Sequence, residues 1–336
     1  MSQSPILFAC SLLVLATVYW NFDILLSACT MVFCLFKSST SWTANDIPDL
    51  KGRVAIVTGG NTGLGYTTVL ELARHGAKVY MASRTQSTAD AAIAAIKSDV
   101  PFAQIEFLAF DLTSLSAARA AAKQLLEKEE RLDILVLNAG VMAKPYELTV
   151  DGIELQACNG TGHFALTVPL LPLLRRTAAM PDSHVRVVTL SSEGHRAAQS
   201  PNFSDLSGLN QRCATALNRY ANSKLSNILF TNELQRRLAG TGIYCLSVHP
   251  GLVATNLYRG THASYPWLAL FSFLTDYVFV SPEQGARTQL YAATALEVEE
   301  KDLKAAYLTP YAQVSTPSVR AQDKSGTLAA QFWALT

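Results

Sequence analysis

The sequence has no excess of either charge and no organised set of cysteines. Its 336 residues include 27 Lys and Arg against 26 Asp and Glu, which gives a formal net charge of +1. This balance offers no electrostatic reason to expect nucleic acid as a partner. The six cysteines have neither the pairing of a disulfide framework nor the spacing of metal ligands. We therefore predict no metal site and a reduced compartment.

No Lys or Arg precedes Lys37, and Asp23 is the only charged residue between Ile6 and Phe36. This apolar run is longer than the roughly 20 residues that a spanning helix needs. A cleavable signal peptide would have a basic start and a shorter apolar core. We predict that residues 1–40 form a single-pass membrane anchor, with a signal peptide and a buried or interfacial helix as alternatives. Because basic residues follow the run, we expect a cytosolic domain at a membrane, that of the endoplasmic reticulum.

No composition break, internal repeat or low-complexity tract divides the rest of the chain. We expect a linker at residues 41–50 and one domain at residues 51–336. Short aliphatic or β-branched runs separated by helix-length stretches predict a parallel sheet covered on both faces, an α/β fold. The predicted strands are Val54–Thr58, Lys78–Ala82, Ile105–Phe110, Leu132–Asn138, Val185–Ser191 and Ile243–Val248. Helix signals are found at Leu64–Arg74, Ser114–Glu130 and Leu217–Leu238.

A glycine-rich turn lies between the first predicted strand and the following helix. Glycines at this position let the backbone approach a ligand, and the helix start offers free N–H groups to a pyrophosphate. The spacing Gly-x-x-x-Gly-x-Gly differs from the common Gly-x-Gly-x-x-Gly fingerprint. Its place in the pattern nevertheless predicts a Rossmann-type, doubly wound dinucleotide-binding domain. The candidate cofactor residues of this turn are Gly59, Asn61, Gly63, Leu64 and Gly65.

The end of the second predicted strand lacks the carboxylate that an NAD enzyme would offer to the ribose 2′-hydroxyl. Arg84 follows that strand instead, and a guanidinium can pair with a 2′-phosphate. We therefore predict NADP (NADPH) as the cofactor. The alternative is that Arg84 is a solvated surface residue.

Tyr220 and Lys224 are four residues apart on a predicted helix, so they share one face. An ammonium beside a phenol would bring proton transfer by the tyrosine nearer to neutral pH. Such pairs also arise by chance on solvated helices, and the interpretation therefore depends on the other motifs.

Taken together, the motifs resemble the short-chain dehydrogenase/reductase family. They are, in the family's order, the glycine turn, Asp111-Leu112, Asn138-Ala139-Gly140, Ser191-Ser192, the Tyr220/Lys224 pair and His249-Pro250-Gly251. The resemblance covers about Lys51 to Phe332 and is strongest to the branch of retinol dehydrogenases and the catalytic part of the WW-domain oxidoreductase. The segments that carry this are Asn159–Phe164, Ser191–Arg196 and Tyr220–Arg237. Gly160 stands where that branch commonly has histidine.

The resemblance implies roles for individual residues. Tyr220 would be the acid/base, and Lys224 would lower its pKa and hold the nicotinamide ribose. Ser192 would steady the substrate oxygen, with a strand-end cap, or Ser191 in its place, as alternatives. Asn159 would belong to a proton relay; alternatively, it only bonds local backbone. Contacts to the adenine, its ribose and the nicotinamide carboxamide are implied for Asp111, for Asn138, and for Val253 and Thr255, respectively.

An aromatic-rich segment lies between Thr255 and Ser281, where the family has a substrate lid. With a membrane anchor it favours a hydrophobic substrate such as a retinoid, sterol, fatty aldehyde or a polyketide of secondary metabolism. The alternative is that this segment only packs on the core or touches lipid. A second function class is a catalytically inactive scaffold that kept the nucleotide fold. Whether the protein forms a homo-oligomer is left open by the sequence.

Overall fold

A twisted sheet forms the centre of the molecule. The computed structural model describes residues 41–199, 201–254 and 279–336. In this part of the chain eight strands join one sheet in the order β3-β2-β1-β4-β5-β6-β7-β8, and only β8 runs antiparallel to its neighbour. Their bounds are β1 (Val54–Thr58), β2 (Lys78–Ser83), β3 (Gln104–Ala109), β4 (Ile134–Leu137), β5 (Arg186–Leu190), β6 (Tyr244–Val248), β7 (Tyr307–Thr309) and β8 (Gln313–Ser315).

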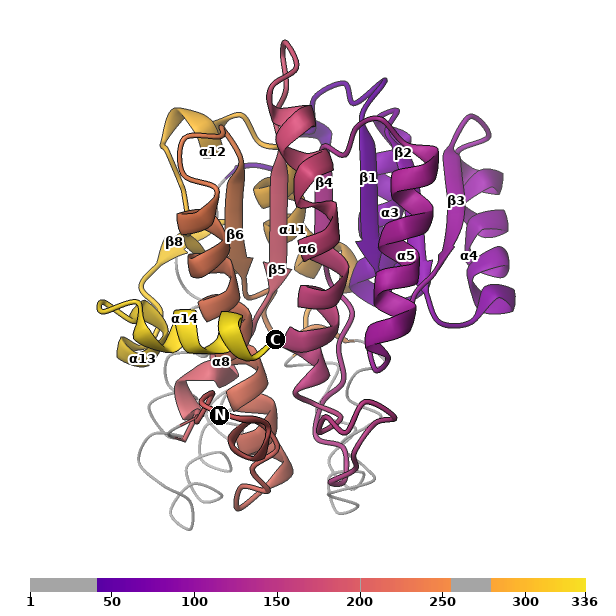
Figure 1. Ribbon diagram of the computed structural model, residues 1–336. Coiled ribbons are helices and arrows are strands. Elements are labelled where there is room, and N and C mark those ends of the chain that lie inside the picture. The colour runs from indigo at the N-terminus through magenta and orange to yellow at the C-terminus, as the bar shows by residue number, and fades with distance from the viewer. Residues whose placement is uncertain (1–40, 200, 255–278) are drawn as a thin grey trace, which may run out of the picture.

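Helices cover both faces of this sheet (Figure 1). One face packs against α5 (Leu115–Lys128), α6 (Cys158–Ala178) and α8 (Ala216–Arg237). The other packs against α3 (Gly63–Arg74), α4 (Gln86–Asp99) and α11 (Pro282–Thr294). The shorter helices are α7 (Leu206–Leu209), α12 (Glu297–Glu300), α13 (Val319–Gln322) and α14 (Thr327–Leu335), with 3-10 turns η1 (Ala44–Asp46) and η2 (Glu193–Ala197).

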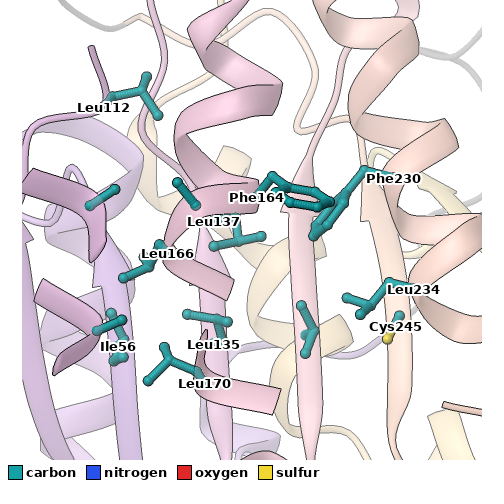
Figure 2. Packing of buried hydrophobic residues seen from close by; sticks show 14 of the residues in the cluster. Ile56, Leu112, Leu135, Leu137, Phe164, Leu166, Leu170, Phe230, Leu234 and Cys245 are labelled. Atoms are coloured by element: carbon teal, nitrogen blue, oxygen red, sulfur yellow. The ribbon is translucent and has the colours of Figure 1, made fainter. Parts of the chain in front are cut away.

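Strand and helix side chains interlock on the first of these faces. Figure 2 shows Leu135 and Leu137 of β4 against Leu166 and Leu170 of α6, and all four are completely buried. Each such leucine contributes about 1.5–3 kcal/mol by leaving water. Because β1, β4, β5 and β6 are buried on both faces, their sequences are apolar runs, and this confirms the predicted Rossmann-type α/β sheet.

The first described residues contact the domain. Trp42, Ile47 and Leu50 are buried, and the Trp42 ring meets Tyr291 of α11 edge-on at 5.6 Å between centroids. The predicted linker at residues 41–50 thus touches the core that α11 covers.

Three predictions fall on residues that the structure does not describe: the anchor at residues 1–40, Thr255, and nearly all of the lid segment. Among residues 41–199, 201–254 and 279–336, no helix is both long and apolar enough to cross a bilayer.

Candidate active site

The carboxyl ends of the parallel strands bring most of the predicted residues to one edge of the sheet. The glycine turn follows β1, Asn138 follows β4, Ser192 follows β5 and Val253 follows β6. Adjacent parallel strands end at the same edge, where ligands of such folds bind. Helix α8 adds Tyr220 and Lys224 at this edge, since the Lys224 Nζ atom donates to the carbonyl of Leu190, the last residue of β5, at 2.9 Å.

The glycine turn is close-packed. Gly59 and Gly63 have φ angles of +65° and +53°, which favour glycine. A Cβ atom on Gly65 would lie 2.2 Å from the Gly59 carbonyl oxygen and 2.7 Å from Asn138 Nδ2. Thr62 begins α3 without a side-chain cap, so no side chain at the cap occupies the first N–H groups of that helix. This geometry leaves them available to an anion.

A hydrogen-bond network joins β1 to the loop after β4. The Thr58 hydroxyl accepts from the backbone N–H groups of Asn138 and Ala139, both at 2.9 Å, and lies 3.0 Å from His163 Nε2. His163 Nδ1 lies 2.9 Å from the Asn159 carbonyl, which can only accept, so Nδ1 carries the proton and Nε2 accepts a hydrogen bond from the Thr58 hydroxyl. Burial and the nearby Lys224 charge lower the pKa of His163 to about 3, so the ring is neutral.

The residues predicted for the adenosine end lie around the end of β2 and the loops beside it. Arg84 is exposed directly after β2. Asn61 Nδ2 donates to the hydroxyl of Thr88 at 3.1 Å, which ties the glycine turn to α4. Asp111 Oδ1 accepts from the backbone N–H of Thr113 at 2.9 Å and from its hydroxyl at 2.7 Å. The Asp111 side chain therefore shapes its own turn.

Val253 and Leu64 pack together against α11. Val253 is buried and pairs with Val280 in a parallel bridge. A Cβ atom on Gly285 would lie 2.5 Å from a Val253 methyl and 2.9 Å from a Leu64 methyl. The glycine on α11 thus permits both side chains to approach the helix.

Tyr220 and Lys224 are buried neighbours on α8. The Lys224 Nζ atom lies 5.7 Å from the centroid of the Tyr220 ring. Burial raises the pKa of Tyr220 to about 12, and a hydrogen bond with Ser192 acts in the opposite direction. Desolvation of the phenolate is the larger of these two effects. That Lys224 lowers this pKa stays a prediction. Burial also lowers the pKa of Lys224 to about 8.

The structure separates the two serines after β5. The Ser191 hydroxyl is buried and donates to the Lys224 carbonyl at 2.7 Å. The Ser192 hydroxyl accepts from the Gly194 N–H at 3.1 Å, so it caps η2, and it also bonds the Tyr220 hydroxyl. Ser192 is thus both a cap and the neighbour of the tyrosine, whereas Ser191 fastens α8 to the strand.

Asn159 uses its whole side-chain amide to hold protein groups. Its Oδ1 accepts from the Val141 N–H at 2.8 Å, and its Nδ2 donates to the Val141 carbonyl at 2.9 Å and to the Ser223 hydroxyl at 3.0 Å. Ser223 in turn donates to the Tyr220 carbonyl at 2.8 Å. Asn159 therefore links the loop after β4 to the helix turn that carries Tyr220. Sequence reasoning missed Ser223, although its spacing of three residues from Tyr220 suits this bond.

The packing around Gly160 of α6 leaves no room for a side chain. A Cβ atom there would lie 2.7 Å from the Ser226 hydroxyl and 2.9 Å from the Phe332 ring. The space beside α6 is therefore occupied by α8 and by α14.

The comparisons with known proteins agree with this geometry. The family model for short chain dehydrogenases matches residues 53–205. A short chain dehydrogenase/reductase of Colletotrichum higginsianum, dpchH, is 42% identical over 313 residues, covering 88% of this chain and 76% of that protein. The chain therefore belongs to the short-chain dehydrogenase/reductase family. It is an oxidoreductase of that family, whose fold binds a nicotinamide dinucleotide.

Two further relatives place the chain more closely. Mouse (Mus musculus) retinol dehydrogenase 12 is 40% identical over 251 residues, covering 74% of this chain and 76% of that protein. The crystal structure of an uncharacterized protein from Mycobacterium paratuberculosis has a TM-score of 0.67 and 36% identity, covering 88% of this chain and 96% of the other. The resemblance to the retinol dehydrogenase branch is thus confirmed.

Proposed function

We propose that the protein is an NADP-dependent oxidoreductase that interconverts a carbonyl and an alcohol on a hydrophobic substrate. The observation that carries this proposal lies at the carboxyl edge of the sheet, where the half-buried Ser192 bonds the buried Tyr220 and the buried Lys224 lies beside the Tyr220 ring. A hydroxyl bonded to a phenol, with an ammonium beside the phenol ring, suits an oxygen that gains charge during reaction.

The residues present fit a nicotinamide dinucleotide, which when bound supplies or accepts the hydride. The close-packed turn at Gly65 and the uncapped start of α3 suit a pyrophosphate. Ser83 Oγ, at the end of β2, is buried without a hydrogen-bond partner among the described residues. In our proposal the residues that hold the dinucleotide are Gly59, Asn61, Gly63, Leu64, Gly65, Arg84, Asp111, Asn138, Tyr220, Lys224, Val253 and Thr255.

Each catalytic side chain has a distinct task in this proposal. Tyr220 gives its proton to the substrate oxygen in reduction and takes it back in oxidation. The Ser192 hydroxyl donates a hydrogen bond to the same oxygen. The Lys224 ammonium has three protons, and among the described residues Leu190 accepts one, so the others are available to the ribose. Asn159 holds the loop and the Tyr220 turn in register.

Arg84 tests the choice of cofactor. Replacing Arg84 with Ala removes charge-assisted bonds to the 2′-phosphate, so we expect the KM for NADPH to rise about 10- to 100-fold and the KM for NADH to stay unchanged. Initial rates with both cofactors measure this. Arg119→Ala, at an exposed arginine on α5, is the matched control. A wild-type enzyme that used NADH more efficiently than NADPH would refute the assignment.

The pH dependence of reduction should report Lys224. Its lowered pKa means that the ammonium is charged below about pH 8 and neutral above it, whereas Tyr220, with a pKa of about 12, stays protonated throughout. Because kcat/KM reflects the free enzyme, we expect it to fall as pH rises through about 8. Lys224→Arg, which does not titrate there, should move this decline to higher pH. A decline that stayed in place in the variant would assign it to another group.

The substrate class and the membrane are proposed from the sequence. The aromatic-rich segment between Thr255 and Ser281 suits a retinoid, a sterol, a fatty aldehyde or a polyketide of secondary metabolism. Residues 1–40 are proposed to anchor the domain at a membrane, because their apolar run exceeds the roughly 20 residues of a spanning helix.

A further inference from the structure

The 3-10 turn η2, which begins directly after Ser192, is held by the C-terminal part of the chain. The Ser318 N–H donates to His195 Nε2 at 3.0 Å, and Arg196 Nη2 donates to the Thr316 carbonyl at 2.8 Å. Arg320 also donates to the carbonyl of Ala198. In each bond the donor and the acceptor are more than a hundred residues apart in the sequence, so η2 is held by a segment distant from it in the chain.

His195 stands between the two segments. Its Nδ1 atom lies 2.7 Å from the Ser192 carbonyl; since a carbonyl only accepts, Nδ1 carries the proton. Nε2 is therefore bare, as its bond from the Ser318 N–H requires. Burial lowers the pKa of His195 to about 4, so the ring is neutral and keeps both bonds at neutral pH. The ring also packs edge-on against Tyr307 of β7, at 5.2 Å between centroids.

The opposite side of η2 touches the catalytic tyrosine. A Cβ atom on Gly194 would lie 3.3 Å from Ser192 Oγ and 3.6 Å from Tyr220 Cε1. The Gly194 N–H also donates to Ser192 Oγ. The orientation of the Ser192 hydroxyl is therefore set by the backbone of η2, and a small displacement of that turn would move this hydroxyl relative to Tyr220.

A second buried contact supports η2 from β7. Glu193 is almost fully buried, and its carboxylate accepts from the Tyr307 hydroxyl at 2.9 Å and from Arg196 Nε at 2.5 Å. A carboxylate of this kind would not be tolerated away from water without such partners. β7 and the segment that follows β8 thus hold η2 at both ends.

We propose that His195 is a positioning residue that connects the C-terminal segment at Ser318 to the Ser192 carbonyl and thereby holds the Ser192 hydroxyl beside that of Tyr220. The inference rests on the proposed role of Ser192 in catalysis. It extends the active site to a segment far from it in the sequence.

A matched pair of variants tests the bond from the Ser318 N–H to His195 Nε2. The Ser318 φ angle is −57°, which proline can adopt. Ser318→Ala and Ser318→Pro both lose the hydroxyl that caps α13, but only the proline loses the N–H that binds His195. We expect kcat to be about 10-fold lower in the proline variant than in the alanine variant, with equal affinity for the dinucleotide. Equal kcat values in the two variants would overturn the inference.

The His195 end is tested by a double-mutant cycle with Ser192. His195→Phe keeps a ring against Tyr307 but loses both hydrogen bonds, and we expect kcat to fall about 10-fold. In a Ser192→Ala background the same change should have almost no further effect, because the hydroxyl that it positions is gone. If His195→Phe lowered kcat about as much in the Ser192→Ala background as in the wild type, His195 would have only a structural role and the inference would be overturned.

Two further variants complete the design. His195→Asn places an amide donor near the position of Nδ1, so it should retain more activity than His195→Phe. His75→Phe is the control, since His75 Nδ1 also binds a backbone carbonyl, that of Glu71, at 2.8 Å but at the other end of the sheet.

If Ser192→Ala alone left kcat unchanged, the proposed role of Ser192 would fail and the inference with it. If His195→Phe did not fold, as judged by circular dichroism, the Ser318 pair would still decide.

Discussion

Replacing Tyr220 with Phe is expected to remove nearly all turnover while keeping the fold and the binding of the dinucleotide. The change deletes one oxygen from a buried ring whose hydroxyl bonds Ser192. The substrate oxygen would then lack its proton donor, so we expect kcat to fall by about 10²- to 10⁴-fold. The measurement is NADPH oxidation with a panel of hydrophobic ketones and aldehydes, beside a fluorescence titration of the dinucleotide.

Tyr244→Phe is the matched control for this prediction. Tyr244 has a similar exposed fraction, 9% against 8% for Tyr220, but its hydroxyl donates to Asp302 away from the site. It should keep the wild-type kcat. A Tyr220→Phe enzyme that retained more than about a tenth of its turnover would contradict the acid/base role. A wild-type protein that bound the dinucleotide but turned over none of the panel would favour the inactive scaffold.

Replacing Gly65 with Ala is expected to abolish useful binding of the dinucleotide. The added Cβ atom would lie 2.2 Å from the Gly59 carbonyl oxygen and 2.7 Å from Asn138 Nδ2. The first atom belongs to the turn itself and the second to the loop after β4, so relief requires the backbone of the turn to move and the bond from Asn138 Nδ2 to the Thr58 carbonyl, 2.8 Å long, to stretch. We expect the dissociation constant to rise by about 100-fold or more, and the free energy of unfolding to fall by about 1–3 kcal/mol.

Isothermal titration below the unfolding temperature measures the first of these effects, and chemical denaturation the second. Gly140→Ala is the control for the free energy of unfolding, which it should leave nearly unchanged. Its Cβ atom would lie 3.5 Å from Asn159 Oδ1 and 3.7 Å from Lys224 Nζ, which are ordinary contact distances. If Gly65→Ala bound the dinucleotide as tightly as wild type, the glycine turn would not be the pyrophosphate site.

The central sheet could be predicted from sequence because its strands are buried on both faces and therefore form apolar runs. The predicted first strand coincides with β1, Val54–Thr58, and the other five differ by a residue or two at their ends. The predicted helix Ser114–Glu130 corresponds to α5, and Ser114 caps it. In these elements local propensity and tertiary burial favour the same structure.

The two last strands could not be predicted. β7 and β8 have three residues each, too few for a pattern. They form because β7 pairs with β6 and β8 pairs with β7. The bond between Ser318 and His195 joins residues 123 positions apart, so no local signal contains it. The role of Asn159 shows a similar limit, since the motif identified the residue but only the fold placed its amide on Val141.

The acidity of Tyr220 depends on burial, and spacing alone says nothing about burial. The interval of four residues to Lys224 correctly placed both side chains on one face of α8. It could not indicate that both would be removed from water, which raises one pKa and lowers the other.

The contact between the C-terminal segment and η2 bears on how incomplete chains would behave. Asn159, Ser192, Tyr220 and Lys224 all precede β7, so a fragment ending near Lys304 would contain every proposed catalytic side chain. It would lack Tyr307 and Ser318, and with them the supports of η2. Under our inference such a fragment is a poor catalyst, so efficient turnover requires the chain to extend at least as far as Ser318.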